Sequence, residues 1–534
     1  MYKNYLLALL SGLLLALAWP TYGFSLFVFI GFVPLLLALN ANRKSGRKRV
    51  NLVNFFTTYI ALLVWNTITT WWIWNSTPAG ALFALFVNSL LMTLVFQLYH
   101  VVSRRKPQRF ALIFLLTLWI AFEKFHLNWD FSWPWLNLGN VFSENPSWIQ
   151  WYEYTGVFGG SLWIWIVNIG VFVAIEKFQR HNDLKILAKQ VLIPISIIVI
   201  GIAFSKIQYH SYVEKGEELS VIVIQPNVDP YTEKYHQPLD QIANNIIELS
   251  NLEIDDSVSF VLAPETVLSK HSTLKRFKVS KAYKTLSDYT QQYPNTSLLV
   301  GSSLIKIFKS KTIPTPTANK FSNTTNSWYE SYNAALYITT NKKPEVYHKS
   351  KLVVGVENFP YRSALAPLLG NIMIEHGSST SVLTTQKEAE VFQHPKSGVN
   401  AAPIICYESI YGEHVSKFSQ KGAGFLAIIT NDSWWGRTQG HKQLLSYARI
   451  RAVENRKAVA RSANSGISAF INQRGDVVKT LAYETKGALK ETMKANKTLT
   501  FYVKHGDYIA RIASFVAVLF LLIALVVKRK KVEG

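Results

Sequence analysis

The stretch NAAPIICYES, residues 400–409, indicates the fold of the larger part of this chain. A short, continuous apolar run leads directly into a cysteine, a tyrosine and a glutamate. Continuous apolar runs are typical of strands whose sheet is covered on both faces, as in layered α/β proteins. Similar runs recur from residue 219 onward: LSVIVIQPNV (219–228), SFVLAPETVL (259–268), SLLVGSSLI (297–305), NAALYIT (333–339), FLAIITND (425–432) and ISAFINQRGDVV (467–478).

Helical segments alternate with these runs. Residues 237–253 and 441–457 have the apolar periodicity of helices. The alternation predicts one α/β layered domain over residues 207–507. Residues 306–331 are rich in Ser, Thr, Asn, Lys and Pro and lack periodicity, so we expect an exposed, mobile loop there.

The rest of the chain is apolar enough to lie in a membrane. The sequence is 49% hydrophobic and 13% aromatic, and its mean hydropathy is +0.13. A membrane-spanning helix needs about 20 mostly apolar residues. The N-terminal run lacks a convincing signal-peptide cleavage site, so we expect it to be retained. We predict eight spans, at residues 5–22, 24–40, 52–74, 79–102, 110–126, 160–177, 189–206 and 508–527.

This count divides the chain into a membrane domain of seven spans (1–206), the α/β domain (207–507), and an eighth span with a basic tail (508–534). The formal net charge is +23, but many basic residues flank apolar runs rather than forming one patch, which argues against nucleic-acid binding. Four basic clusters follow alternate spans: Arg43, Lys44, Arg47, Lys48 and Arg49; Arg104, Arg105, Lys106 and Arg109; Lys177, Arg180, Lys185 and Lys189; and Lys528–Lys531.

Basic loops stay on the cytoplasmic side of a membrane. A cytoplasmic N-terminus therefore predicts that residues 127–159 and the α/β domain both lie outside the cytoplasm. Glu123 falls inside the fifth span, where an ionisable group indicates a functional or paired role. The tryptophans of the 127–159 loop either anchor it at the membrane interface or line an entrance for lipid; they are Trp129, Trp133, Trp135, Trp148 and Trp151.

Cys406 is the only cysteine, so no intramolecular disulfide can form. It is either a buried small apolar residue or a nucleophile at a strand-to-helix elbow, and its place after an apolar run favours the nucleophile. A thiol needs a base, and its attack on a carbonyl needs positive charge near the developing oxyanion. Glu265, in APET, is a candidate base or a helix N-terminal carboxylate; Lys349 is a candidate cation or a solvated surface lysine.

Together, the order Glu, Lys, Cys and the sequences around these residues resemble the nitrilase (carbon-nitrogen hydrolase) superfamily. The resemblance lies in VIVIQPN (221–227), APET (263–266), KSKLVVGVENFP (349–360), ICYES (405–409), TNDSWWG (430–436) and the block from 449 to 478. It implies an αββα sandwich for the α/β domain, with Glu265 as base, Lys349 as oxyanion stabiliser and Cys406 as nucleophile.

Within that superfamily, an α/β domain inserted before the last span is similar to the apolipoprotein N-acyltransferase family. LWIAFEKF (118–125) and FSWPWLNLGN (131–140) also resemble the membrane half of that family. The resemblance implies that Glu357 and Glu408 assist the site, and that Tyr407, Trp434 and Trp435 belong to its acyl-pocket or loop region. After Lys349, the family's usual run His-Leu-Val-Pro-Phe-Gly-Glu appears as KLVVGVE, which keeps the spacing to Glu357 but replaces the loop's proline and glycine.

The resemblance further implies a monomer in the bacterial inner membrane with a periplasmic catalytic domain. It would pass an acyl chain from a phospholipid, through a cysteine thioester, to the α-amino group of a diacylated lipoprotein. Neither step needs a cofactor or metal, and the histidines His348, His441 and His505 are too scattered to suggest a metal site. Two alternatives remain: a membrane-tethered nitrilase-type amidase, and a membrane assembly protein without enzymatic activity.

Overall fold

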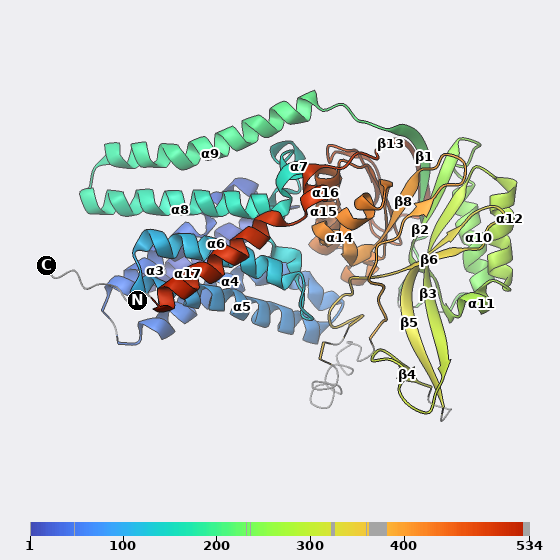
Figure 1. Cartoon of the computed structure of the whole chain (residues 1–534), viewed down its shortest axis with the longest axis horizontal. Helices are drawn as coiled ribbons and strands as arrows, with labels where there is room; N and C mark the ends of the chain where they lie inside the picture. The colour runs from blue at the N-terminus through green and yellow to red at the C-terminus, as the bar shows by residue number, and fades with distance from the viewer. Residues whose placement is uncertain are drawn as a thin grey trace. The chain divides into compact units, whose positions relative to one another are not determined.

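The structure is a computed structural model that describes residues 2–46, 48–230, 232–234, 236–321, 326–358, 360–361 and 382–526. The chain forms two compact units (Figure 1). The helical unit comprises residues 1–74, 79–211 and 505–534, and the α/β unit comprises residues 75–78 and 212–504.

The helical unit consists of long apolar helices joined by short turns. Its α-helices are α1 (Tyr2–Leu17), α2 (Val28–Gly31), α3 (Val33–Lys44), α4 (Val50–Thr70), α5 (Pro78–Arg105), α6 (Gln108–His126), α7 (Tyr152–Thr155), α8 (Val157–His181), α9 (Leu184–Ser211) and α17 (Tyr508–Val526). Short 3₁₀ helices lie between them: η1 (Ser25–Phe27), η2 (Trp71–Asn75), η3 (Pro134–Leu136), η4 (Leu138–Phe142) and η5 (Pro146–Trp148).

Helices cover most of each predicted span, and the span 24–40 is made of η1, α2 and α3. Among the described residues, six helical segments are long and apolar enough to cross a membrane: 25–44, 50–75, 78–105, 157–181, 184–211 and 508–526. The other two predicted spans correspond to α1, which has only 16 residues, and to α6, whose 19 residues include three charged ones. Eight spans therefore stay a prediction, and the basic cluster Lys528–Lys531 lies outside the described residues.

The surface of α9 shows why this unit belongs in lipid. Leu192, Ile193, Val199 and Ile200 are each between 58% and 66% exposed. An apolar helix that leaves such side chains uncovered is unfavourable in water and suits a hydrocarbon environment. The protein is therefore a membrane protein with a helical membrane unit.

Inside the helical unit, Glu123 of α6 has the paired role that its position predicted. Its carboxylate accepts hydrogen bonds from the indole N–H of Trp119 at 3.0 Å and from the backbone N–H of Leu138 at 2.8 Å. Trp135, from the tryptophan-rich loop, is fully buried, with its ring centre 4.7 Å from that of Trp72. For Trp135, both predicted roles are wrong, because the ring packs in the protein interior.

The α/β unit contains two sheets. In its described part, the first sheet has the order β13-β1-β2-β3-β5-β4, with β6 beside β5. Its strands are β1 (Glu217–Gln225), β2 (Val258–Ser272), β3 (Ser297–Lys309), β4 (Asn319–Lys320), β5 (Ser327–Ile338), β6 (Glu345–His348) and β13 (Gly487–Ala495). The second sheet has the order β12-β11-β10-β9-β8-β7. Its strands are β7 (Phe392–Gln393), β8 (Asn400–Ile405), β9 (Ala423–Thr430), β10 (Val459–Ala463), β11 (Ser468–Ile471) and β12 (Val477–Leu481).

Each sheet has a parallel centre, because β1, β2 and β3 run parallel, as do β8, β9 and β10. The apolar runs of the sequence form these strands, which are buried on both faces. The helices of the unit are α10 (Leu239–Ser250), α11 (Leu274–Phe277), α12 (Lys281–Gln292), α14 (Gly412–Gln420), α15 (Gln439–Asn455) and α16 (Phe501–His505), with the 3₁₀ helices η6 (Cys406–Ile410) and η7 (Asp432–Trp435).

The layers of the α/β unit follow the order helix, sheet, sheet, helix. Helices α10 and α12 cover the first sheet, where Ile246 and Leu286 join one apolar core with Val261 and Val300. Helix α14 packs against β8 and β9 of the second sheet. The inner faces of the sheets meet, as the ring of Phe260 lies 5.2 Å from that of Phe425. The predicted fold class, a helical membrane domain with an αββα sandwich, is confirmed.

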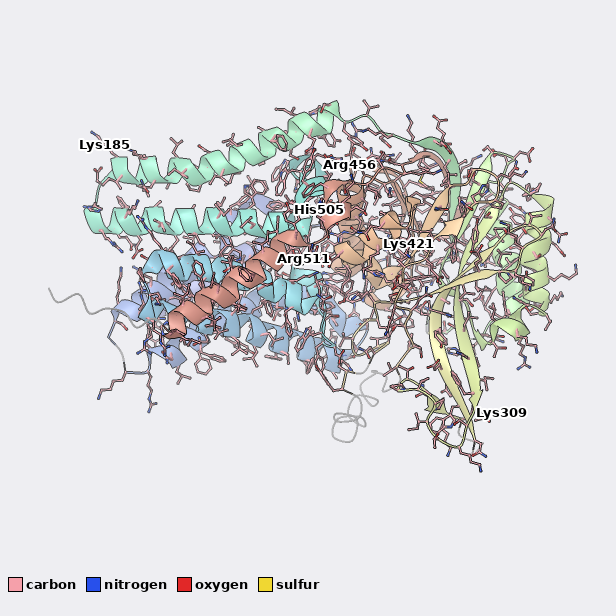
Figure 2. The ribbon with its side chains drawn as sticks, in the orientation of Figure 1. Lys185, Lys309, Lys421, Arg456, His505 and Arg511 are labelled. Atoms are coloured by element: carbon pink, nitrogen blue, oxygen red, sulfur yellow. The ribbon has the colours of Figure 1, made fainter. Side chains whose placement is uncertain are left out.

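One prediction in this unit is wrong in part. Residues 306–331 are not a continuous loop, because β3 and β5 pair as far as Lys309 and Ser327, and β4 adds a short third strand. Figure 2 shows Lys309 at the far end of this hairpin. The polar, Lys-rich composition predicted a loop, but backbone pairing continues the two strands through this largely exposed stretch.

Candidate active site

Two of the three predicted catalytic residues lie at irregular points of the backbone. Glu265 lies in β2 where its pairing with β3 shifts register, and the next residue, Thr266, has a positive φ of 46°. Cys406 follows β8 directly, begins η6 and has a φ of 51°. A left-handed conformation costs a non-glycine residue about 1 to 2 kcal/mol, and such strain is concentrated at functional sites. The sharp bend at Cys406 is the elbow that the sequence predicts.

Lys349 follows β6 and lies between two carboxylates. Its ammonium nitrogen is 2.8 Å from Oε1 of Glu265 and 2.9 Å from Oε1 of Glu357. The three side chains are 1%, 7% and 14% exposed, respectively. A buried ion cluster of this kind adds little to stability, because removing charges from water is costly. Its presence in the interior therefore points to a functional role.

The Oε2 atoms of Glu265 and Glu357 also accept hydrogen bonds. Oε2 of Glu265 accepts a hydrogen bond from the backbone N–H of Asn431 at 3.0 Å, and Oε2 of Glu357 accepts one from Val353 at 2.9 Å. The amide of Asn333 donates to Oε1 of Glu265 at 2.7 Å and to Oε1 of Glu357 at 3.0 Å. The geometry of both carboxylates is therefore fixed by neighbouring donors.

The loop from Lys349 to Glu357 ends in a tight turn that begins at Val353. The carbonyl of Val353 accepts hydrogen bonds from the N–H groups of Val356, Glu357 and Asn358, and Gly355 has a φ of 81°. Glycine adopts this left-handed conformation without strain because it has no Cβ. The turn brings Glu357 back to Lys349 although the proline and glycine of the family's usual run are replaced.

The charges set the protonation of the site. Burial raises the pKa of the Glu265 carboxyl, but the charge and hydrogen bond of Lys349, together with the Asn333 hydrogen bond and the charge of Lys234, bring the pKa below its usual value. Burial lowers the pKa of Lys349, but Glu265 and Glu357 hold it well above its usual value. Burial and the charge of Glu265 raise the pKa of the Cys406 thiol, against a smaller opposing effect of Lys349. The site thus combines an ionised carboxylate, an ammonium group and a protonated thiol.

Glu408 connects the cysteine elbow to the end of β6. It is fully buried, and its carboxylate accepts hydrogen bonds from Ile405 N at 2.8 Å, Ser350 N at 2.6 Å and the Tyr347 hydroxyl at 2.7 Å. Ile405 precedes Cys406, and Ser350 follows Lys349. Glu408 therefore holds the two backbone segments that carry these residues.

Tyr407 directly follows Cys406, and Trp434 and Trp435 lie shortly after Asn431. Tyr407 is buried, with its ring 5.4 Å from that of Tyr411. Trp434 and Trp435 are partly exposed in η7. The ammonium group of Lys234 lies 5.7 Å from the centre of the Trp434 ring and donates to the Thr266 hydroxyl at 2.6 Å. Burial lowers the pKa of Lys234 to about 8.

Comparisons with known proteins match both units. A model for the apolipoprotein N-acyltransferase N-terminal domain matches residues 11–170, and a carbon-nitrogen hydrolase model matches residues 313–498. The apolipoprotein N-acyltransferase of Chlorobaculum tepidum is 26% identical over 99% of this chain and 97% of its own. Apolipoprotein N-acyltransferase 1 of Treponema denticola is 27% identical over 99% of this chain and 98% of its own. The chain belongs to the apolipoprotein N-acyltransferase family.

In this member of the apolipoprotein N-acyltransferase family, the carbon-nitrogen hydrolase match includes Lys349, Glu357 and Cys406 but begins after Glu265. The place of Glu265 in the site therefore rests on its 2.8 Å contact with Lys349. Within the described residues, no group of three or more His, Cys, Asp or Glu side chains is placed to hold a metal ion.

The sequence did not indicate Asn333, Lys234 or the backbone N–H of Asn431 as members of the site. Asn333 begins the run NAALYIT, where it looked like the start of a strand. Its contacts depend on the pairing of β5 with β3 and β6, which a single sequence does not give. The N–H of Asn431 carries no side-chain signal, although TNDSWWG marked its loop.

Proposed function

We propose that this protein transfers a fatty acyl chain from a membrane phospholipid to the α-amino group of a lipoprotein's N-terminal diacylglyceryl-cysteine. The observation that carries the proposal is a buried carboxylate–lysine pair whose two charges both act on the only thiol of the chain. The chain's likeness to apolipoprotein N-acyltransferases over nearly its whole length supports this activity over that of a tethered amidase.

In the first step, Cys406 takes the acyl chain. The Glu265 carboxylate accepts the thiol proton while Sγ attacks the ester carbonyl of the phospholipid. The ammonium group of Lys349 and the backbone N–H of Tyr407 stabilise the negative oxygen of the tetrahedral intermediate. The carbon–oxygen bond of the ester then breaks, Glu265 returns its proton to the departing oxygen, and a lysophospholipid leaves a thioester on Cys406.

In the second step, the thioester is passed to an amine. The neutral α-amino group attacks the thioester carbonyl, and Glu265 accepts a proton from the nitrogen. The carbon–sulfur bond breaks, Cys406 leaves as a thiolate, and Glu265 returns the proton to it. The products are an amide and the free thiol, so every atom and proton is accounted for without a cofactor.

Other residues have supporting roles in this proposal. Glu357 holds Lys349 between two carboxylates, and Glu408 fixes the backbone beside Lys349 and Cys406. Tyr407, Trp434 and Trp435 would contribute to the acyl pocket or its loop. The α/β unit would act on the periplasmic side of a bacterial inner membrane, where both lipid-anchored substrates can reach it.

Reconstitution of the full chain tests this function. The assay contains a phospholipid with a labelled acyl chain and a synthetic diacylated lipopeptide with a free α-amino group. We expect the peptide to gain the mass of one acyl chain while an equal amount of lysophospholipid forms. The same peptide with an acetylated α-amino group should gain nothing. Release of free fatty acid without acylation of the peptide would instead identify a hydrolase.

A further inference from the structure

Asn333 of β5 contacts all three charged residues of the site. Its side-chain nitrogen donates to Oε1 of Glu265 at 2.7 Å and to Oε1 of Glu357 at 3.0 Å. Its backbone carbonyl accepts the N–H of Lys349 at 2.8 Å. The residue is 4% exposed, so water does not compete for these bonds. One buried residue therefore touches the base, its cation and the second carboxylate.

The orientation of the Asn333 amide follows from its neighbours. Rotating the amide by 180° would place Oδ1 against two carboxylate oxygens. All three oxygens are hydrogen-bond acceptors, so both hydrogen bonds would be lost. In the described part of the chain, Oδ1 is buried without a hydrogen-bond partner. A buried polar atom without a hydrogen bond is destabilising. The orientation that leaves Oδ1 unpaired is the one in which Nδ2 donates to both carboxylates.

Asn333 and Lys349 act on the same pair of oxygens. Oε1 of Glu265 and Oε1 of Glu357 each receive one bond from the Lys349 ammonium and one from the Asn333 amide. Of these two bridging donors, Lys349 is charged and Asn333 is neutral. The neutral amide favours the ionised form of both carboxylates without placing a further charge in the buried cluster.

We propose that Asn333 is a positioning residue that bridges Glu265 and Glu357 and keeps both carboxylates ionised and aligned beside Lys349. The inference rests on the proposed role of Glu265 as the base. Without the bridge, the hydrogen bonds of Lys349 and the charge of Lys234 remain, but the two like charges lose a donor that they share. One of the carboxylates then takes up a proton more readily. The base is then protonated over a wider pH range, so Cys406 reacts only at higher pH.

The test is the pH dependence of Cys406 acylation by phospholipid in full-length Asn333→Leu. We expect the acid limb of the pH–rate profile to move up by about 1 to 2 pH units, the usual effect of lost hydrogen bonds to a charged group. The rate should recover toward the wild-type rate at alkaline pH. Asn333→Asp has nearly the wild-type shape and should shift the limb at least as far, which keeps the test decisive if Asn333→Leu folds poorly.

Asn496→Leu is the matched control. Asn496 is also buried, and among the residues that the structure describes its side-chain amide bonds to Arg456 O and to Thr498, outside the charged cluster. Its replacement should leave the midpoint of the acid limb unchanged. A rate that falls equally at every pH in both Asn333 variants, with no shift of the limb, would overturn the inference and indicate a merely structural role.

Alkylation of Cys406 by iodoacetamide separates this inference from the proposed function. Cys406 is the only cysteine, so the added mass reports this thiol alone without any lipid. The acid limb of alkylation should shift in the same direction in both Asn333 variants. A shift in a protein that transfers no acyl chain would support the inference while the proposed function fails. An unshifted alkylation profile in an active acyltransferase would overturn the inference alone.

Discussion

Replacement of Glu265 by Gln is expected to slow the acylation of Cys406 by about 10²- to 10⁴-fold, the usual contribution of a general base. Burial raises the pKa of the Cys406 thiol, so little thiolate exists at neutral pH. Glu265 is the ionised group that can take the proton, and Gln has its shape without its basicity. The measurement is the rate at which an acyl chain appears on Cys406 after mixing with phospholipid.

The pH dependence of Glu265→Gln gives a second readout. The charge of Glu265 itself raises the pKa of the thiol, so its removal lowers that pKa. Since the thiolate then forms more easily in alkaline solution, the deficit should shrink as the pH rises. Glu345→Gln, at an exposed position on β6, should acylate at the wild-type rate. Normal acylation of Glu265→Gln at neutral pH would exclude Glu265 as the base of the first step.

Replacement of Lys349 by Met is expected to lower the rate of Cys406 acylation by about 10²- to 10³-fold, the usual effect of losing one oxyanion donor. It also leaves Glu265 and Glu357 facing each other without their cation. Breaking a buried ion pair in this way costs about 3 to 5 kcal/mol of stability. Thermal unfolding must therefore accompany the rate measurement, so that loss of the fold is not mistaken for loss of chemistry.

Lys349→Arg separates charge from geometry. Arginine keeps the positive charge but presents a planar fork in place of a compact ammonium group. We expect this variant to be more stable than Lys349→Met and still at least about 10-fold slower than the wild type, a smaller loss than for Lys349→Met. Lys343→Met, at an exposed position just before β6, is the matched control and should change neither quantity. Full activity of a stable Lys349→Met protein would remove Lys349 from the mechanism.

The sequence indicated most of the fold because continuous apolar runs mark buried strands directly. The run 400–409 contains β8, and the run 219–228 contains all of β1 except its first two residues. The hairpin formed by β3 and β5 was harder to find, because its outer part lies in a polar, Lys-rich stretch and is largely not buried. Apolar periodicity alone could not decide the number of spans, because α1 is short and α6 contains charged residues.

The candidate site was only partly visible in the sequence, and its residues fall into two groups. Lys349 and Cys406 directly follow strands, and Glu265 lies at the register shift within β2, each in a motif of recognisable type. Asn333 lies within β5 and joins the site only through the register of three strands. Lys234 is a lysine in a polar stretch, which composition alone predicts to be solvated, yet it is buried against Thr266 and Trp434.

The central claim is that Cys406 carries the acyl chain. The direct measurement is peptide mass spectrometry of the full chain after incubation with phospholipid and no acceptor. We expect one acyl chain on the peptide that contains Cys406, released by hydroxylamine as a thioester and absent in Cys406→Ala. An acyl chain on another residue, or transfer to lipopeptide at the wild-type rate by Cys406→Ala, would contradict the account.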